Sequence, residues 1–272
     1  MDFKSRRFFR IVRYTIKRFS DERGTESAAS IAYYAIFSLF PLILVLIVIG
    51  SKVLESSDAQ EQILEWVTRI LPFAGDIIRE NIQQVLARRS SVGLIGTLTL
   101  AWGATGVFST LARNINRAWE RTAERNFIKL KLMGLSLIAA LIVFMSILLI
   151  LNPILSLVLN QLNNISPVSF MIPIVTQLSL WLFLFGTISL LYYWIPNWKV
   201  RPSASVIGGI FSASAIELVT ILFTFYLGSG LARYNLVYGS LGAIVALVFW
   251  IYLLSMIIIF GAHLTATLDT GV

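Results

Sequence analysis

Two ionisable side chains, Glu217 and His263, lie inside long apolar stretches of the sequence. Glu217 is the one charged residue among residues 203–227, and His263 lies near the end of the apolar run 237–266. A charged group in membrane hydrocarbon costs about 2.5–3.5 kcal/mol by insertion scales, so such groups face a partner, a cavity or water. These two residues are therefore our first candidates for a translocation path.

Small residues precede Glu217 at four-residue intervals, namely Ser205, Gly209 and Ala213. Small side chains form the contact faces of membrane helices, so this spacing predicts that the Glu217 carboxylate points into a helix bundle. The alternative for His263, the one histidine of the chain, is an ordinary hydrogen-bonded histidine.

Helix breaks extend the candidate path to Pro41, Asn152 and Pro153. Pro41 should bend the first apolar helix, and a break at Asn152 and Pro153 would expose main-chain carbonyls to a cavity. A kink that serves only packing is the alternative at Pro41. The candidate path thus comprises Glu217, His263, Asn152, Pro153 and Pro41.

Composition places these residues in a polytopic membrane protein. The chain is 57% hydrophobic and 13% charged, with a mean hydropathy of +0.80. A hydrocarbon core of roughly 30 Å needs about 20 helical residues to cross it. Six uncharged apolar runs are long enough, so we predict an all-α protein with six transmembrane helices. The runs are approximately residues 29–51, 91–112, 132–159, 168–195, 203–227 and 237–266.

The net charge of +8 follows the predicted topology and does not indicate nucleic-acid binding. Lys and Arg gather before the first run, between the second and third, and between the fourth and fifth. Such residues accumulate in cytoplasmic loops, so both termini are predicted to be cytoplasmic. Six of the 22 Lys and Arg residues lie in the alternate segments, namely Lys52, Arg69, Arg79, Arg88, Arg89 and Arg233.

Residues 1–28 are predicted to form a basic amphipathic N-terminal segment ahead of a membrane domain at 29–268. A helix within them would lie in the inner membrane interface, and the alternative is a plain topology signal. Gly24 is predicted to end this helix. Its apolar face carries Phe9, Val12, Ile16 and Phe19, and its basic face carries Arg6, Arg10, Arg13 and Lys17.

The outer loop, residues 54–90, shows apolar residues at helical spacing on both sides of Pro72 and Gly75. This pattern predicts two short amphipathic helices, which would form a lid or cap the bundle.

Arginines recur every four residues after the second apolar run, at Arg113, Arg117, Arg121 and Arg125. This spacing winds a basic ribbon around a helical extension, which could hold lipid phosphates or nucleotide. A positive-inside loop is the alternative. We treat the four residues as candidate contacts for anionic headgroups.

Three motifs, in this order and spacing, resemble the YihY/virulence factor BrkB family of bacterial inner-membrane proteins. The resemblance covers nearly the whole chain and implies six helices with cytoplasmic termini. Many members have Glu where this chain has His263, so a role that needs a carboxylate there is in doubt. The motifs are Ala32-Tyr33-Tyr34 through Ser38-Leu39-Phe40-Pro41, Trp102-Gly103-Ala104 through Asn116-Arg117-Ala118-Trp119, and Tyr238-Gly239-Ser240-Leu241-Gly242-Ala243 through Trp250-Ile251-Tyr252 and Gly261-Ala262.

The family also carries an old label as a ribonuclease, ribonuclease BN, which the residues do not favour. A metal-dependent nuclease needs clustered His and Asp ligands. Glu120 and Glu124 are the only carboxylates in the inner loops between the predicted helices, and they lie among arginines. We therefore expect no enzyme activity, no catalytic residue, no metal and no cofactor.

The sequence favours a transporter-like or lipid-translocating protein of the bacterial inner membrane, with a polar path near the second, fifth and sixth helices. The alternative is a non-transporting scaffold or envelope assembly factor, in which Glu217 ties helices together. Membrane lipids, anionic phospholipids among them, are the expected partners, and no nucleic acid is expected. The sequence leaves open a homo-oligomer or a protein partner in the envelope.

Overall fold

The computed structural model describes residues 3–38, 106–119, 126, 128–129, 132–134, 171–229 and 242–271. These residues form helices and their connections. The four longest elements are α1 (Phe3–Asp21), α7 (Met171–Trp194), α8 (Pro202–Gly228) and α10 (Gly242–Thr270). Residues 24–38 and 106–117 are also helical. The fold is therefore all-helical in the described part of the chain.

Three of the described helices are long and apolar enough to cross a membrane, namely Gln177–Trp194, Pro202–Gly228 and Ile244–Thr270. They confirm helices at the predicted runs 168–195, 203–227 and 237–266. The runs 29–51, 91–112 and 132–159 lie largely outside the described residues, and the outer loop 54–90 lies entirely outside them. The six-helix count and its orientation stay predictions.

Local sequence sets the ends of α8. Arg201 is extended, with φ −67° and ψ 129°, and Pro202 occupies the first turn, where its missing N–H is not needed. At the other end the Ser229 N–H donates to the Phe225 carbonyl. The predicted small-residue face is confirmed, because Ser205, Gly209 and Ala213 are all buried.

Glycines let α8 approach its neighbours closely. A Cβ added at Gly208 would lie 1.8 Å from Thr265 Oγ1 of α10, and one at Gly209 would lie 1.9 Å from Ser189 Oγ of α7. Because the hydrophobic effect does not drive helices together in lipid, close packing of this kind is a main source of helix association. The glycine pair therefore joins α8 to both α7 and α10.

A buried hydroxyl joins the same three helices. The Tyr192 Oη of α7 donates to the Ile258 carbonyl of α10 at 2.7 Å and shares a hydrogen bond with Ser212 Oγ of α8 at 2.8 Å. Tyr192 and Ser212 are fully buried. This junction fixes α7, α8 and α10 against one another without any charged group.

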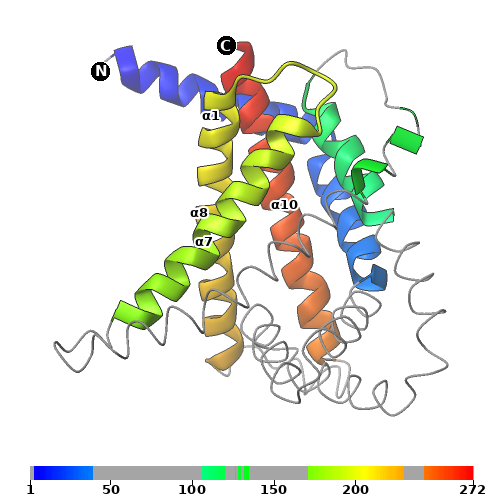
Figure 1. The fold of residues 1–272 in the computed structure, drawn as a ribbon, viewed down its shortest axis with the longest axis vertical. Helices are drawn as coiled ribbons and strands as arrows, with labels where there is room; N and C mark the ends of the chain where they lie inside the picture. The colour runs from blue at the N-terminus through cyan, green and yellow to red at the C-terminus, as the bar shows by residue number, and fades with distance from the viewer. Residues whose placement is uncertain are drawn as a thin grey trace.

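The start of α1 and the end of α10 lie at the same end of the helix array (Figure 1). α7, α8 and α10 run along the array, whereas α1 crosses it near the end of α10 (Figure 1). The predicted cytoplasmic position of both termini requires this arrangement, but the side of the membrane stays a prediction.

The predicted end of α1 is wrong in its details. Arg23, and not Gly24, takes the left-handed conformation, with φ 53°, and Gly24 begins the next helix. A Cβ at Gly24 would lie 2.3 Å from the Phe19 ring. Gly24 is therefore needed for its close contact with Phe19, and the left-handed residue of the turn is Arg23.

α1 has three faces, where the sequence predicted two. Thr15 and Arg18 are buried, and the Thr15 Oγ1 lies at hydrogen-bonding distance, 3.3 Å, from Thr267 Oγ1 of α10. Phe9 and Ile16, on the predicted apolar face, are exposed. The packed face also includes the half-buried Phe19, whose ring contacts Phe260 and His263 of α10. The interfacial position of α1 stays a prediction.

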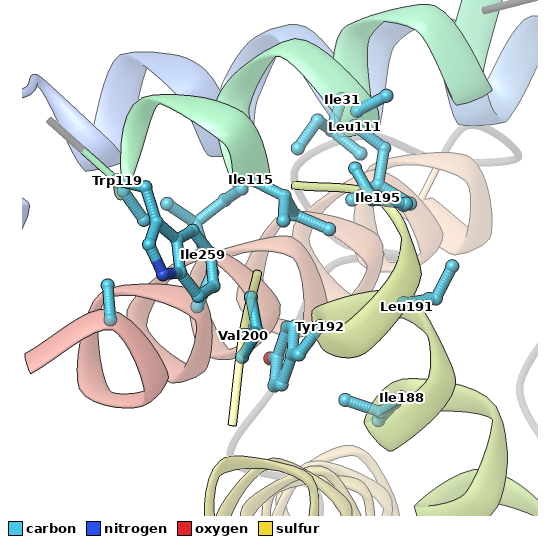
Figure 2. Packing of buried hydrophobic residues seen from close by; sticks show 14 of the residues in the cluster. Ile31, Leu111, Ile115, Trp119, Ile188, Leu191, Tyr192, Ile195, Val200 and Ile259 are labelled. Atoms are coloured by element: carbon cyan, nitrogen blue, oxygen red, sulfur yellow. The ribbon is translucent and has the colours of Figure 1, made fainter. Parts of the chain in front are cut away.

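A buried hydrophobic cluster lies at the same end of the array and includes residues of α7, α8, α10 and the helices at 24–38 and 106–117. Figure 2 shows part of it. The cluster includes Ile188, Leu191 and Tyr192 of α7 and the buried Ile195, which directly follows that helix. The cluster also includes Leu111, Ile115 and Trp119, with Val200 and with Ile259 of α10 (Figure 2).

Candidate functional site

Glu217 lies in the contact between α7 and α8. Fifteen residues at 1.5 Å each put it about 22 Å from the start of α8. The residue is half-buried, and Gln177 Nε2 of α7 donates a hydrogen bond to its Oε1. The carboxylate is therefore bonded by an amide of the neighbouring apolar helix, and its predicted inward position stays a prediction.

His263 lies in a different contact, between α1 and α10. Its ring is buried and packs edge-on to Phe19, with 6.1 Å between the ring centroids. Within the described part of the chain, its Nδ1 has no hydrogen-bond partner. His263 thus belongs to the packing of α1 on α10.

The structure does not bring Glu217 and His263 together. Gly208 of α8 lies beside Gly261 and Thr265 of α10, which is the level of His263. Glu217 is nine residues further along α8, or about 14 Å at 1.5 Å per residue. Any path that used both groups would have to run along the helices over that distance.

The other candidate path residues, Pro41, Asn152 and Pro153, lie outside the described residues. So do Arg121 and Arg125 of the basic ribbon.

Arg113 and Arg117 are described, and both line a cavity of about 340 Å³ between helical residues 24–38 and 106–117. They are on one helical face because they are four residues apart. The described lining residues are Arg23, Glu26, Ser27, Ser30, Tyr34, Thr110, Arg113, Asn114 and Arg117.

A third polar site, at Asp269, was not predicted. Its side chain is 3% exposed, whereas that of its ion-pair partner Arg201 is 57% exposed. Oδ1 accepts from the Arg201 main-chain N–H at 2.9 Å and from Arg201 Nε at 3.2 Å. Oδ2 accepts from Trp119 Nε1 at 3.2 Å. One carboxylate therefore joins the segment after helix 106–117, the start of α8 and the end of α10.

Arg201 also caps α10. Its guanidinium donates to the main-chain carbonyls of Leu268 and Asp269. The last carbonyls of a helix lack partners within it, and a cation there is favoured by the helix dipole. This capping explains why α10 continues to Thr270, four residues beyond the predicted run.

A signal for Asp269 was present in the sequence. It is the one acidic residue after Glu217, and it lies three residues after the end of the last apolar run. Of its partners, Trp119 was noted only as part of the second family motif, and Arg201 belongs to the basic residues between the fourth and fifth apolar runs. Their separations of 150 and 68 residues from Asp269 left no local pattern to connect them.

Among the described residues, no three His, Cys, Asp or Glu side chains are arranged to hold a metal ion.

The comparisons with known proteins agree with the resemblance. The model of the family described as "Virulence factor BrkB" matches residues 15–271. The chain is 29% identical over 268 residues to the UPF0761 membrane protein VV0203 of Vibrio vulnificus (strain YJ016), covering 94% of this chain and 82% of that one. It is 27% identical over 262 residues to the "Putative ribonuclease-like protein YfkH" of Bacillus subtilis (strain 168), covering 92% of each. No solved structure matches the chain.

Proposed function

The chain belongs to the Virulence factor BrkB family, and on that premise we propose that this membrane protein translocates an anionic lipid or a similar polar substrate. In this proposal it crosses the bacterial cytoplasmic membrane six times, with both termini in the cytoplasm. The path runs near the second, fifth and sixth predicted helices, the last two of which are α8 and α10. Pro41, Asn152 and Pro153 stay predicted members of it.

The observation that supports the proposal is the position of Glu217. The carboxylate lies within an apolar helix, close to the exposed side chains of Leu218 and Ile221. In hydrocarbon a carboxylate needs a proton, a cation or a polar partner. The amide of Gln177 supplies one hydrogen bond, but it carries no positive charge. A coupling proton or cation would complete the site.

A purely structural role would not need a carboxylate. The Tyr192 hydroxyl already joins α7, α8 and α10 through neutral groups. An amide at position 217 could also bond Gln177 without the cost of a charge in lipid. The presence of an ionisable group therefore favours a role for its charge.

The bond between Gln177 and Glu217 also supports a second candidate function. Because it links two membrane helices, it suits a non-transporting scaffold or envelope assembly factor. Such a protein would present its helices to a second copy or to an envelope protein.

Replacing Glu217 by Gln distinguishes the two functions, since it keeps the shape and the hydrogen bond but removes the charge. Wild-type protein and the Glu217→Gln variant would be reconstituted at equal density in liposomes that contain fluorescent phosphatidylglycerol. Movement of the probe between leaflets would be followed by quenching from the outside. We expect wild-type protein to accelerate movement and the variant to lose that acceleration.

Control variants separate charge from folding. Thermal unfolding in detergent should place Glu217→Gln close to wild-type protein, so that lost movement reports the charge. Gln177→Leu, which removes the amide and leaves the carboxylate, should unfold more readily. Acceleration by Glu217→Gln equal to that of wild-type protein would contradict a role for the carboxylate in translocation.

A further inference from the structure

The cavity between helical residues 24–38 and 106–117 is positively charged. Among the described lining residues three are arginines, Arg23, Arg113 and Arg117, and one is an acid, Glu26, which leaves a net charge of +2 on these residues. Guanidinium groups match the oxygen geometry of phosphate through paired N–H donors. The cavity therefore suits an anion of the phosphate type.

Neutral polar groups complete the lining. Ser27, Ser30 and Tyr34 fall on one face of their helix, at spacings of three and four residues, across from Thr110 and Asn114. Ser27, Thr110 and Asn114 are buried. Buried hydroxyl and amide groups are normally hydrogen-bonded, and here they surround a space that three arginines share.

Local bonds hold two of the arginines in place. Arg117 Nη1 donates to Asn114 Oδ1 at 3.5 Å, and Asn114 Nδ2 donates to the Thr110 carbonyl at 2.8 Å. Arg113 Nε donates to the Ser109 carbonyl at 3.3 Å. A guanidinium has five N–H donors, so each of these bonds leaves donors that can serve a ligand.

The third arginine enters the cavity through an unusual backbone conformation. Arg23 has φ 53°, which costs a residue other than glycine about 1–2 kcal/mol. The turn places Arg23 at the start of helix 24–38, beside the other lining residues. Its ion pair with Glu26, at 3.5 Å, is exposed and so contributes little to stability. Strained backbone of this kind is found preferentially at binding sites.

An exposed aromatic row leads away from the cavity. Tyr34 lines it, and Tyr33 packs on Tyr34 and on Phe37 with centroid separations of 5.4 and 4.9 Å. Tyr33 and Phe37 are 60% and 62% exposed. Aromatic side chains of this kind gather at the depth of the lipid headgroups. An inorganic anion would make no use of this row, whereas the acyl chains of a lipid would lie along it.

We propose that this cavity binds the phosphate of an anionic phospholipid, with the acyl chains along Tyr33 and Phe37. The volume of about 340 Å³ is at the lower end of the roughly 300–1,000 Å³ of ligand pockets, which suits a headgroup and not a whole lipid. The inference rests on the proposed function in assigning the substrate class, but binding can be measured without translocation.

The test is a binding measurement on the full-length protein in detergent. Its probes are dioctanoyl phosphatidylglycerol, dioctanoyl phosphatidylcholine and inorganic phosphate. The test variant is Arg113→Gln with Arg117→Gln, and the matched control removes two exposed lysines that do not line the cavity, by Lys129→Gln with Lys199→Gln. We expect the test variant to weaken phosphatidylglycerol binding at least about tenfold, the size of a lost charge-assisted hydrogen bond. The control should change it less than about twofold.

A variant that is expected to bind more tightly shows that the changes in binding do not come from misfolding. Glu26→Gln removes the acid among the described lining residues, so it should strengthen phosphatidylglycerol binding. Phosphatidylcholine, whose headgroup has no net charge, should bind more weakly than phosphatidylglycerol.

Two results would overturn the proposal. Equal weakening by the test and control variants would show that the cavity is not the site. Binding of inorganic phosphate that depends on Arg113 and Arg117, without any preference for phosphatidylglycerol, would assign the cavity to a soluble anion. Intact lipid binding by a protein that moves no lipid would contradict the proposed function and leave this site standing.

Discussion

Asp269→Asn should destabilise the protein, because it removes the charge at the point where three elements meet. The wild-type carboxylate accepts two bonds from Arg201 and one from Trp119, and its side chain is 3% exposed. An amide has one acceptor oxygen. If that oxygen accepts the hydrogen bonds from Arg201, the amide N–H groups face the Trp119 N–H. Two donors cannot form a hydrogen bond with each other, so the Trp119 N–H loses its acceptor.

The expected loss follows from these contacts. The Arg201 guanidinium is more than half exposed, so its ion pair with Asp269 contributes at most about 1 kcal/mol. The buried indole N–H and the Arg201 main-chain N–H lose charge-assisted bonds, which are worth about 1.5–3 kcal/mol each, although the amide oxygen keeps part of one. We expect Asp269→Asn to lower the free energy of unfolding by about 2–4 kcal/mol.

Reversible unfolding in mixed detergent micelles measures this loss. Asp21→Asn is the matched control, since Asp21 is exposed at the end of α1, and it should change stability by less than about 0.5 kcal/mol. Trp119→Phe should cost about 1–2 kcal/mol in wild-type protein and much less in the Asp269→Asn background. Unchanged stability of Asp269→Asn, or additive effects of the two substitutions, would refute the reasoning.

Two further predictions concern single backbone positions. Gly261→Ala would place a Cβ 1.9 Å from Ser212 Oγ and 2.4 Å from Tyr192 Oη, so thermal unfolding should show a loss of about 1–3 kcal/mol. Gly228→Ala, where nothing lies within 4 Å of the added Cβ, is its control and should be close to neutral; a similar loss in both would contradict the packing. Arg23→Gly relieves the left-handed strain and should stabilise the protein by up to about 1 kcal/mol while weakening phosphatidylglycerol binding. Lower stability of Arg23→Gly would contradict the backbone strain at Arg23, and unchanged phosphatidylglycerol binding would contradict its part in the cavity.

The three apolar helices α7, α8 and α10 could be predicted because hydrophobic length is a local property of the sequence. The small-residue face of α8 was predicted for the same reason, as its members recur at a helical interval. The exact end of α10 could not be predicted. It depends on Arg201, which caps the helix although it lies 68 residues away from Asp269 in the sequence.

The candidate sites show the same division. The sequence identified Glu217 and the arginines Arg113 and Arg117 as unusual, because each is conspicuous among its neighbours. It could not show that Arg23 joins the same cavity, since this requires a left-handed residue in a turn and the packing of two helices. Nor could the sequence show that Glu217 and His263 lie apart, because the distance between them depends on how α8 and α10 are aligned.

The measurement that tests the central claim most directly is the rate at which wild-type protein moves phospholipids between leaflets of reconstituted liposomes. Fluorescent phosphatidylglycerol and fluorescent phosphatidylcholine would be compared in proteoliposomes and in empty liposomes of the same composition. A translocating protein with a basic headgroup site predicts faster movement in proteoliposomes, and more so for phosphatidylglycerol. Rates equal to those of empty liposomes for both lipids, with folded and inserted protein, would contradict lipid translocation.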